Sequence, residues 1–435
     1  MSLEQAGVPS VAVHTHVFAR LAQATARAAG MPRTRQAYVP QPIVDQTPEQ
    51  LRAYIEGHDP VSKRPFMQEL IEGLTKSLDD EDLKGLTFER STPRLLAPDT
   101  EDNLQKLFVE NNWTDFLPVI LPTEERVAAM LKGTSRKPDE VVARLRPAAF
   151  REFWEITVEK VAVNAVMAGA KPEYLPVILA LIASGQTARS SSTTSFAVLG
   201  VVNGPIRDEI GMNSGIGAMG PYNHANATIG RAYNLASING QGGSVPGESY
   251  MGSLGNWYNY SAVFPEAEER SPWQPFHVQK GFKPTDSTVS VFFGGWYTNA
   301  GYGPRATWQE KFRHCLAASE HHNPPLLVID PIAARLFHKM GFDTKEKLIR
   351  WLHDNAQLPA REFWDNQWIQ TLVKPLAEAG VEPWASKLKA DPDELVTMFD
   401  EQDIHIVVTG GETQGAWKLF GGSWRGKIVS VDEWR

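Results

Sequence analysis

The pattern of apolar and polar residues at the start of the chain predicts a strand, a helix and a second strand. Val8–Val13 is a short apolar run typical of a buried strand, and Val17–Ala29 repeats apolar residues at helical spacing up to Gly30, a common helix stop. Ala37–Val39 then has the pattern of another strand. We assign residues 1–60 to a partial Rossmann-like unit of the doubly wound type.

Residues 61–140 have helical and loop patterns and are expected to connect two parts of the chain. Helix starts are indicated at Thr47–Gln50, just before this region, and at Thr123–Arg126 within it. Asp115–Pro122 contains an apolar run bracketed by prolines, which fits either an edge strand or a docking arm.

The middle region, residues 141–305, changes in composition after its first helices. Val158–Leu181 predicts two short helices separated by Gly169–Pro172. Glycine, asparagine and serine then dominate from Thr193 to Gly303, and we expect an ordered α+β domain rich in loops. The elements predicted within that stretch are strands at Phe196–Val202 and Val289–Phe293 and a helix at Asn226–Ile238.

Residues 306–435 return to an α/β pattern. Leu326–Ile329 and Ile404–Val408 are apolar runs of strand length, and the chain ends on strand-like Lys427–Val431. Helices are predicted at Ile332–Phe337, Lys345–His353 and Asp393–Phe399. The expected fold class is α/β, with Rossmann-like doubly wound units at both ends and a glycine- and asparagine-rich α+β middle region.

Composition and charge favour a globular protein that binds neither nucleic acid nor membrane. Of 435 residues, 42% are hydrophobic and 22% charged, and the formal net charge is -8 without any basic run. No apolar run approaches the ~18 residues of a membrane span, and no signal peptide pattern precedes Pro9. Cys315 is the only cysteine, which excludes a disulfide within the chain or a cysteine-based zinc site and fits a cytoplasmic location.

Gly215–Gly220 matches the GxGxxG dinucleotide fingerprint but lacks its context. The fingerprint requires a strand immediately before it and a helix immediately after it. Here Glu209–Ser214 is not a hydrophobic strand, and Pro221 follows. An acidic residue about 20 positions later is also missing. We therefore expect no nicotinamide or flavin cofactor.

Two loops that follow predicted strands are candidate substrate sites, because ligands of open α/β sheets bind at the carboxyl ends of strands. In the first loop, Gly410 and Gly411 let backbone N–H groups approach an anion, and Glu412 or Gln414 can orient a substrate. The alternative is a tight turn with solvated tips. The second loop starts at Asn203 and ends at Arg207, which would clamp a carboxylate unless the segment is only a structural turn.

Asparagine side chains gather around the helix predicted in the middle region. Asn213, Asn223, Asn226 and Asn239 all lie close to it in sequence, together with His224. Carboxamides hold substrates and stabilise developing negative charge, although asparagine is also common in turns and helix caps. We favour a polar pocket.

Three other positions leave alternatives open. Glu159 would suit acid–base chemistry if burial raised its pKa, but not if it lies on a solvated helix face. His14 and His16 are expected on one face of the first strand, where they would bind a metal ion or an anionic substrate, or cap the next helix. Two histidines do not complete a zinc site, so the metal content stays open. Cys315 is expected to be a buried, inert thiol.

Several stretches together point to a known family. They are Ala19–Pro42, Asn112–Pro118, Val158–Gly169, Lys171–Tyr174, Asn203–Ile206 and Ala225–Ala232. They resemble the UGSC-type family of (seleno)proteins, which is named for a selenocysteine- or cysteine-Gly-Ser-Cys motif. The resemblance covers most of the chain to about Asp286 and, more loosely, the Gly410-Gly411 region. It implies a thiol-disulfide oxidoreductase activity that rests on the motif.

The sequence departs from the family pattern in its sulfur chemistry. The motif would stand upstream of Leu3, and Ala170 occupies the position where a cysteine is expected after Gly169. We therefore expect a smaller partner chain, in a hetero-oligomer, to supply the missing strand, the motif loop and the start of the helix that ends at Gly7. Homo-oligomer formation is compatible with this arrangement.

Three functions fit these residues. The favoured one is an enzyme subunit that acts on a small polar organic molecule by acid–base chemistry of the lyase, hydratase or hydrolase type. The alternatives are the large subunit of a thiol- or selenol-linked oxidoreductase whose reactive thiol is on the partner, and a non-catalytic binding subunit. For the favoured function, the expected catalytic residues are Glu159, Asn203, His224 and Glu412, and the expected substrate-binding residues are His14, His16, Arg207, Asn213, Asn226, Gly410, Gly411 and Gln414.

Overall fold

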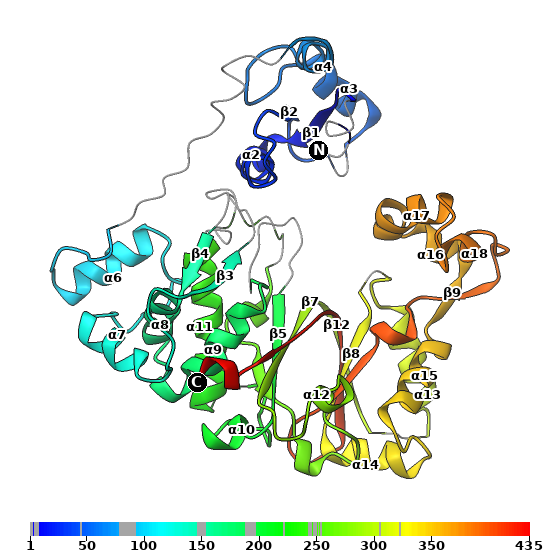
Figure 1. Cartoon of the computed structure of the whole chain (residues 1–435). Helices are drawn as coiled ribbons and strands as arrows, with labels where there is room; N and C mark the ends of the chain where they lie inside the picture. The colour runs from blue at the N-terminus through cyan, green and yellow to red at the C-terminus, as the bar shows by residue number, and fades with distance from the viewer. Residues whose placement is uncertain are drawn as a thin grey trace.

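In the computed structural model, an N-terminal α/β unit stands beside a larger body built around one mixed β-sheet (Figure 1). The structure describes residues 3, 8–43, 46–77, 93–145, 154–187, 197–220, 222–241, 246, 250, 252, 255–303, 306–321 and 323–435. The helix end expected at Gly7 lies outside these residues.

The N-terminal unit has the predicted strand–helix–strand order. Strand β1 (Val11–Thr15) pairs in parallel with β2 (Arg35–Val39). Between them lie the 3-10 helix η1 (His16–Phe18) and α2 (Ala19–Ala28). Gly30 follows α2 with a φ of 72°, a conformation that glycine adopts without steric cost, so the predicted helix stop is confirmed.

Two more helices complete this unit and bury its small core. Helix α3 (Pro48–Glu56) begins at the predicted capping box, and α4 (Phe66–Thr75) packs on the strands. A Cβ atom on Gly73 would lie 2.5 Å from Val11 Cγ2, so only glycine allows α4 to approach β1 this closely. The buried side chains of this core belong to Ala37, Val39 and Phe66.

The connecting region contains α6 (Glu101–Glu110) and α7 (Glu124–Leu131), and the predicted Thr123 cap is present. Asp115–Pro122 forms no strand. It is a docking arm, in which the Asp115 carboxylate lies 3.0 Å from both Arg231 Nε and Nη2. The Arg231 guanidinium also donates to the Pro118 carbonyl at 2.8 Å, which fixes the arm against the larger body.

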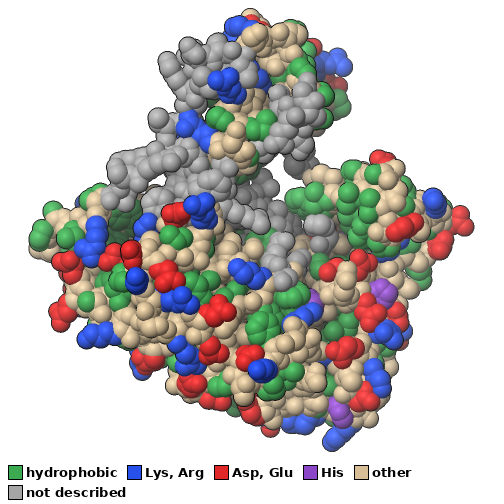
Figure 2. Space-filling model, in the orientation of Figure 1, with side chains coloured by type: hydrophobic (Ala, Val, Ile, Leu, Met, Phe, Trp, Pro, Cys, Tyr) green, Lys and Arg blue, Asp and Glu red, His purple; other side chains and the backbone are tan. Residues whose placement is uncertain are grey.

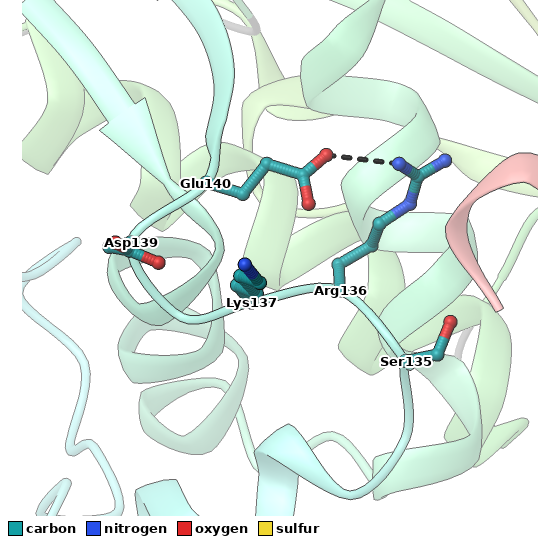
Figure 3. Close-up of a pocket in the computed structure, with 5 residues that line it drawn as sticks. All are labelled: Ser135, Arg136, Lys137, Asp139 and Glu140. Carbon is teal, nitrogen blue, oxygen red and sulfur yellow. Dashed lines mark hydrogen bonds and ion pairs between the residues drawn. The ribbon is translucent and has the colours of Figure 1, made fainter.

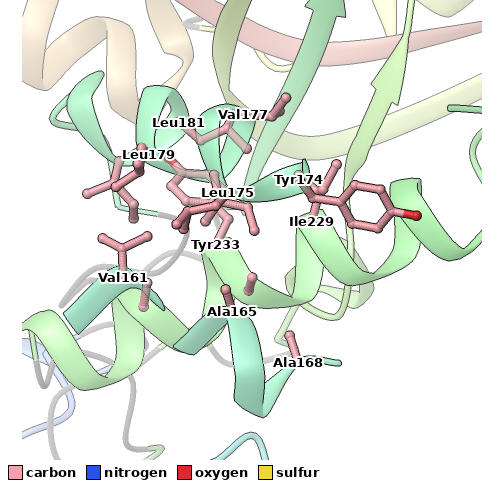
Figure 4. Packing of buried hydrophobic residues seen from close by; sticks show 14 of the residues in the cluster. Val161, Ala165, Ala168, Tyr174, Leu175, Val177, Leu179, Leu181, Ile229 and Tyr233 are labelled. Carbon is pink, nitrogen blue, oxygen red and sulfur yellow. The ribbon is translucent and has the colours of Figure 1, made fainter. Parts of the chain in front are cut away.

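Three helices pack together as one apolar layer of the larger body (Figure 4). They are α8 (Val158–Met167), α9 (Leu175–Ala183) and α11 (His224–Gln241). Leu175–Ile182 is buried throughout, because α9 has other elements on every side and carries no charged residue. The predicted break between the first two helices is confirmed at Gly169, whose φ is 80°.

The central sheet has six strands in the order β11-β8-β12-β7-β5-β6. The strands are β5 (Ala197–Asn203), β6 (Val263–Pro265), β7 (Thr288–Tyr302), β8 (Pro325–Ile329), β11 (His405–Val408) and β12 (Ala416–Ser430). The pairs β5–β6 and β8–β11 are parallel, whereas β7 and β12 form a long antiparallel pair between them. The sheet is therefore α/β but mixed, and the expected doubly wound arrangement is not confirmed.

The sheet curls until its two edge strands meet. Gly294 lies at a bend of β7 with a φ of 152°, and a Cβ atom there would lie 2.2 Å from the Gly421 carbonyl oxygen. Beyond the end of β6, the Ala267 N–H donates to the Val408 carbonyl of β11 at 2.7 Å. The Thr409 hydroxyl donates back to the Pro265 carbonyl at 2.8 Å. The inside of the curl is filled by the side chains of Leu199, Val201, Phe264, Phe276, Phe292, Leu326 and Phe420.

Helices α13 (Trp308–Ala317), α14 (Pro331–Lys339) and α15 (Lys345–Asn355) pack beside β8 and β11. The helix predicted over Asp393–Phe399 is wrong. Its centre is strand β10 (Leu395–Thr397), which pairs with β9 (Gln357–Pro359) and contains the β-branched Val396 and Thr397.

The remaining elements are short. They are β3 (Val141–Leu145), β4 (Trp154–Thr157), η2 (Pro172–Tyr174), α10 (Ile206–Glu209), η3 (Trp257–Asn259), η4 (Glu268–Arg270), α12 (Phe276–Gln279), α16 (Ala360–Asp365), η5 (Ile369–Val373), α17 (Lys374–Glu378), α18 (Trp384–Leu388), η6 (Glu401–Asp403) and η7 (Asp432–Trp434). Among the described helices, none is long and apolar enough to cross a membrane. Acidic and basic side chains alternate over the face of the larger body in Figure 2, so no basic stripe is visible there.

One buried side chain makes the stability of this fold depend on pH. His405 is 4% exposed, and its ring lies 5.5–5.8 Å from the rings of Phe276, Phe292 and Trp424. Burial, helped by Lys280 and Lys345, lowers the pKa of His405 to about 3. The unfolded chain therefore takes up a proton near pH 6.5 that the folded chain refuses, and stability falls as the pH falls from about 6.5 towards 3.

We predict that His405→Leu flattens this dependence. One pKa unit corresponds to about 1.4 kcal/mol, so the wild type should lose about 2 kcal/mol more than the variant between pH 7.5 and pH 5.0. Urea unfolding at both pH values measures the difference. The exposed His314, replaced by leucine, is the control and should behave as the wild type. Equal losses for His405→Leu and wild type would contradict the assignment.

Candidate functional site

Three chain segments converge where β5, β6 and β11 end, and we call this place the strand-end junction. The segments are Asn203–Arg207, Glu266–Arg270 and Val408–Glu412. Each segment begins at or directly after the end of an apolar strand, and its first polar side chain, Asn203, Glu266 or Thr409, is buried. The two loops that the sequence marked as candidate substrate sites are thus brought together, with the 266–270 segment between them.

At the bottom of the junction, Glu266 and Lys345 form a fully buried ion pair. Their Oε1 and Nζ atoms are 2.8 Å apart, and both side chains have no solvent exposure. The other oxygen, Oε2, accepts hydrogen bonds of 2.7 Å from Asn203 Nδ2 and from the Phe276 backbone N–H. These hydrogen bonds replace those that the Glu266 carboxylate would make with water, as a buried charge requires.

A second carboxylate, Glu268, lies above this pair. It accepts hydrogen bonds from Asn203 Nδ2 at 2.9 Å and from the Gly204 N–H at 2.8 Å. The guanidinium of Arg207, only 4% exposed, lies 3.2 Å from Glu268 and donates to Glu269 at 2.6 Å and to the Glu266 carbonyl at 2.7 Å. Desolvation opposes the charge of Arg207, but these acidic partners raise its pKa and keep it cationic.

His277 completes the buried side of the junction. Its ring has no solvent exposure, and Nδ1 lies 3.9 Å from Glu268 Oε1. Burial lowers the pKa of His277, although Glu268, Glu266 and the backbone of Lys283 oppose that shift. The imidazole is therefore neutral at pH 7 and able to accept a proton.

Several buried polar atoms of His277, Asn203 and the facing strand β7 have no hydrogen-bond partner of normal geometry within the described structure. They are both ring nitrogens of His277, Asn203 Oδ1, Thr288 Oγ1 and Ser290 Oγ. Thr288 lies directly opposite Asn203 in the β5–β7 register, and Ser290 lies opposite Val201, so the three polar side chains line one face of the sheet.

The outer side of the junction is held by Arg270. Its guanidinium donates to the Gly410 carbonyl at 3.1 Å and to the Ser214 carbonyl at 2.6 Å, and the Gly410 N–H donates to the same Ser214 carbonyl at 2.9 Å. Glu412 pairs with Arg335 at 2.9 Å, which lowers the pKa of Glu412. Gln414 is exposed on the same loop.

The asparagines predicted to form a pocket mainly hold the loop before α11. Asn226, 2% exposed, donates through Nδ2 to the carbonyls of Asn213 and Ala218, and its Oδ1 accepts from the Asn213 N–H. Asn223 Oδ1 accepts from the Asn226 N–H near the start of α11. These carboxamides thus stabilise a turn and a helix start, which was the alternative to a polar pocket. The loop that they hold contacts Gly410 through the Ser214 carbonyl.

The other predicted site residues lie away from the junction. Glu159 is in the first turn of α8, where its carboxylate is 2.7 Å from Arg94. His224 begins α11 and packs against Tyr174 at 5.8 Å between ring centroids. His14 and His16 belong to the N-terminal unit. Because β1 ends at Thr15, His16 lies in a 3-10 turn, and the strand alternation that would align the two rings does not reach it.

Sequence reasoning missed Glu266, Glu268, His277 and Lys345. The only local signal is that Glu266 directly follows the apolar run of β6, in the manner of the two loops that were recognised. Lys345 was read as an ordinary first residue of a helix, and nothing in its neighbours indicates burial.

Two further features of the larger body lie outside the junction. Figure 3 shows an open depression at Ser135–Glu140, in which Arg136 pairs with Glu140 at 3.1 Å. Arg136 Nε also donates to the Glu433 carbonyl at 2.8 Å, so this loop holds the residues of η7.

Cys315 is half-buried, and burial raises its pKa, so the thiol is protonated at neutral pH. Among the described residues, no group of three or more His, Cys, Asp or Glu side chains is arranged to hold a metal ion.

Comparison with known proteins finds a family likeness for the N-terminal unit. A model described as the UGSC family matches residues 1–62. Over these residues the chain is similar to the UGSC family. A search of curated proteins finds no match. The UGSC segment spans β1, α2, β2 and α3 and contains His14 and His16, whereas the strand-end junction lies outside it.

We predict that Lys345→Met destabilises the protein by about 3–5 kcal/mol, because it leaves the Glu266 charge buried without its partner. Adding Glu266→Gln should restore a large part of the loss, since the amide carries no charge. Urea unfolding monitored by tryptophan fluorescence measures these differences.

Lys347→Met is the matched control. Lys347 lies two positions after Lys345 in α15, and its side chain is 58% exposed and pairs with Asp343. Its replacement should leave the unfolding free energy unchanged within error. If both lysine variants changed the unfolding free energy equally, the buried ion pair would contribute no more to stability than the exposed one.

Proposed function

We propose that the chain is an enzyme subunit that performs acid–base chemistry on a small polar organic molecule at the strand-end junction. The reaction is of the lyase, hydratase or hydrolase type. His277 is the base, Asn203 and Thr288 hold the substrate, and Lys345 with Arg207 supplies the positive charge that stabilises a developing anion.

The observation that carries this proposal is the set of unpaired polar atoms on His277, Asn203, Thr288 and Ser290. A buried polar atom without a partner costs about 1–3 kcal/mol, so five of them on neighbouring residues are a costly arrangement for a purely structural core. A polar guest with both donor and acceptor groups would satisfy the imidazole, the Asn203 carbonyl oxygen and the Thr288 hydroxyl together. The guest would lie at the carboxyl end of β5, where ligands of α/β sheets commonly bind.

The surrounding charges suit proton transfer. A neutral His277 can take a proton from the substrate, and the Glu268 carboxylate 3.9 Å from Nδ1 would stabilise the imidazolium that results. Because the site excludes bulk water, the nearby cations act on a developing oxyanion more strongly than they would at the surface.

This assignment keeps Asn203 and Arg207 from the sequence-based hypothesis and moves the base to His277. Glu159 and Glu412 are each engaged by an arginine, at 2.7 and 2.9 Å, and both are therefore positioned for other contacts. Gly410 and Gly411 form the outer wall, where a Cβ atom on Gly411 would lie 2.2 Å from Ile216.

Turnover is tested by proton NMR in D2O with hydroxy acids, amides and unsaturated acids as substrate classes. We expect deuterium incorporation, hydration or hydrolysis for at least one class, and a fall of at least about 100-fold in His277→Gln, since a general base contributes about 10²–10⁴. His314→Gln should keep full activity. No turnover of any class, or full turnover by His277→Gln, would contradict the proposal.

Thr288→Val separates function from folding. Valine has the shape of threonine but no hydroxyl, so the variant should unfold about 1 kcal/mol less readily while losing turnover. A loss of stability would instead mean that the hydroxyl has a structural partner.

The proposal includes a smaller partner subunit. Supporting it, the described residues of the UGSC segment form two strands that pair in parallel, a sheet type that is normally covered on both faces. Val8, Val13 and Ile43 are each about half exposed. Native mass spectrometry of the protein from its source should show an additional smaller chain. A single 48.3 kDa species or its multiples, fully active, would refute this part.

A further inference from the structure

The buried cations of the strand-end junction already have partners of opposite charge. Lys345 Nζ lies 2.8 Å from Glu266 Oε1, and both side chains are fully buried. The guanidinium of Arg207 lies 3.2 Å from Glu268 and 2.6 Å from Glu269. A guest with a full charge of its own would have to displace one of these partners or stay uncompensated, and both are costly in a site that excludes water.

The cation on the outer side of the junction, Arg270, is also engaged. Its guanidinium donates to the Gly410 carbonyl at 3.1 Å and to the Ser214 carbonyl at 2.6 Å. The pKa of Glu269 is lowered by Arg207 and also by Arg270, which places the Arg270 charge near an acidic group. Arg270 therefore has acceptors and an acidic neighbour before any guest binds.

The atoms of the junction that lack partners belong to uncharged groups. They are the carbonyl oxygen of Asn203, the hydroxyls of Thr288 and Ser290, and the ring nitrogens of His277, whose imidazole is neutral because burial lowers its pKa. Asn203 Oδ1 can only accept, whereas each hydroxyl can both donate and accept. A guest that satisfies these atoms needs at least one N–H or O–H donor and one acceptor, and it needs no charge.

The register of β5 and β7 sets the order of these groups. Asn203 and Thr288 lie opposite each other, and Ser290 lies two positions further along the same face of β7. Phe292 and Val201 continue this face into the apolar core inside the curl. A planar amide suits the first pair, because its N–H can donate to Asn203 Oδ1 while its oxygen accepts from the Thr288 hydroxyl.

We propose that the substrate of the strand-end junction is an uncharged carboxamide with a small polar substituent, and that the corresponding carboxylate is rejected. This inference rests on the proposed function, because it names the substrate class of the same site. A carboxylate has no N–H to offer Asn203 Oδ1, so it would leave that oxygen unpaired and place a negative charge beside it. The paired cations can still stabilise negative charge that develops during the reaction.

Isothermal titration of the full chain with lactamide, lactate and glycerol tests the substrate class. Lactamide and lactate differ only in the amide and the carboxylate, and glycerol is uncharged but has no amide. We expect one lactamide site per chain and binding of lactate and glycerol that is weaker by at least about tenfold. Thr288→Val should weaken lactamide binding about fivefold or more. Thr371→Val, at an exposed threonine outside the junction, should leave it unchanged.

Glu268→Gln provides a gain that misfolding cannot imitate. It removes one negative charge beside Arg207, which keeps Glu269 as a partner, so lactate binding should tighten relative to lactamide binding. Glu124→Gln, at a carboxylate that is 68% exposed and pairs with Arg94, should not change this preference.

Two kinds of failure are distinguishable. If the wild type binds or turns over lactate or glycerol better than lactamide, the inference on substrate class is overturned while the proposed function stands. The same holds if the two threonine variants behave alike or if Glu268→Gln leaves the preference unchanged. If none of the three probes binds and no substrate class is turned over, the inference and the proposed function are overturned together.

Discussion

The carboxylate of Glu266 is the group on which the arrangement of the larger body depends. It is buried where the two edges of the curled sheet meet, and it is paired with Lys345 from the start of α15. Its second oxygen binds β5 through Asn203 and the start of α12 through the Phe276 N–H. One side chain therefore connects elements that are distant in sequence, and an uncompensated charge at this depth would cost several kcal/mol. The sheet edges and the helices around them therefore pack stably only in an arrangement that gives the Glu266 carboxylate its partners.

The hydrogen bonds that stabilise the Glu266 carboxylate leave other buried polar atoms of the junction without partners. The Asn203 side chain makes both of its described hydrogen bonds through Nδ2, to Glu266 and Glu268, so its carbonyl oxygen is left without a described partner. This is why we place the chemistry here and not at the exposed ion pairs of Glu159 or Glu412. The site combines the rigid Glu266–Lys345 ion pair with polar atoms that lack partners, the combination expected of a preorganised binding site.

The sequence allowed the local elements to be predicted wherever periodicity and caps agree. The α2 helix with its Gly30 stop, the Thr47 and Thr123 caps and the strands ending at Asn203 and Val408 follow from such signals. The long β7–β12 pair was missed because its glycines, among them Gly294, resemble loop residues until the partner strand is known. Lys345 was missed for a related reason: its burial depends on a carboxylate 79 positions away, and no local pattern reports such a contact.

The central claim is that the unpaired polar atoms at the strand-end junction receive a substrate. A high-resolution crystal structure of the protein purified from its source tests this most directly. The account predicts continuous density for a small organic molecule within hydrogen-bonding distance of His277, the Asn203 carbonyl oxygen and the Thr288 hydroxyl. Isolated water molecules that satisfy all of these atoms, unchanged after soaking with a turned-over substrate, would contradict it and reduce the junction to a structural core.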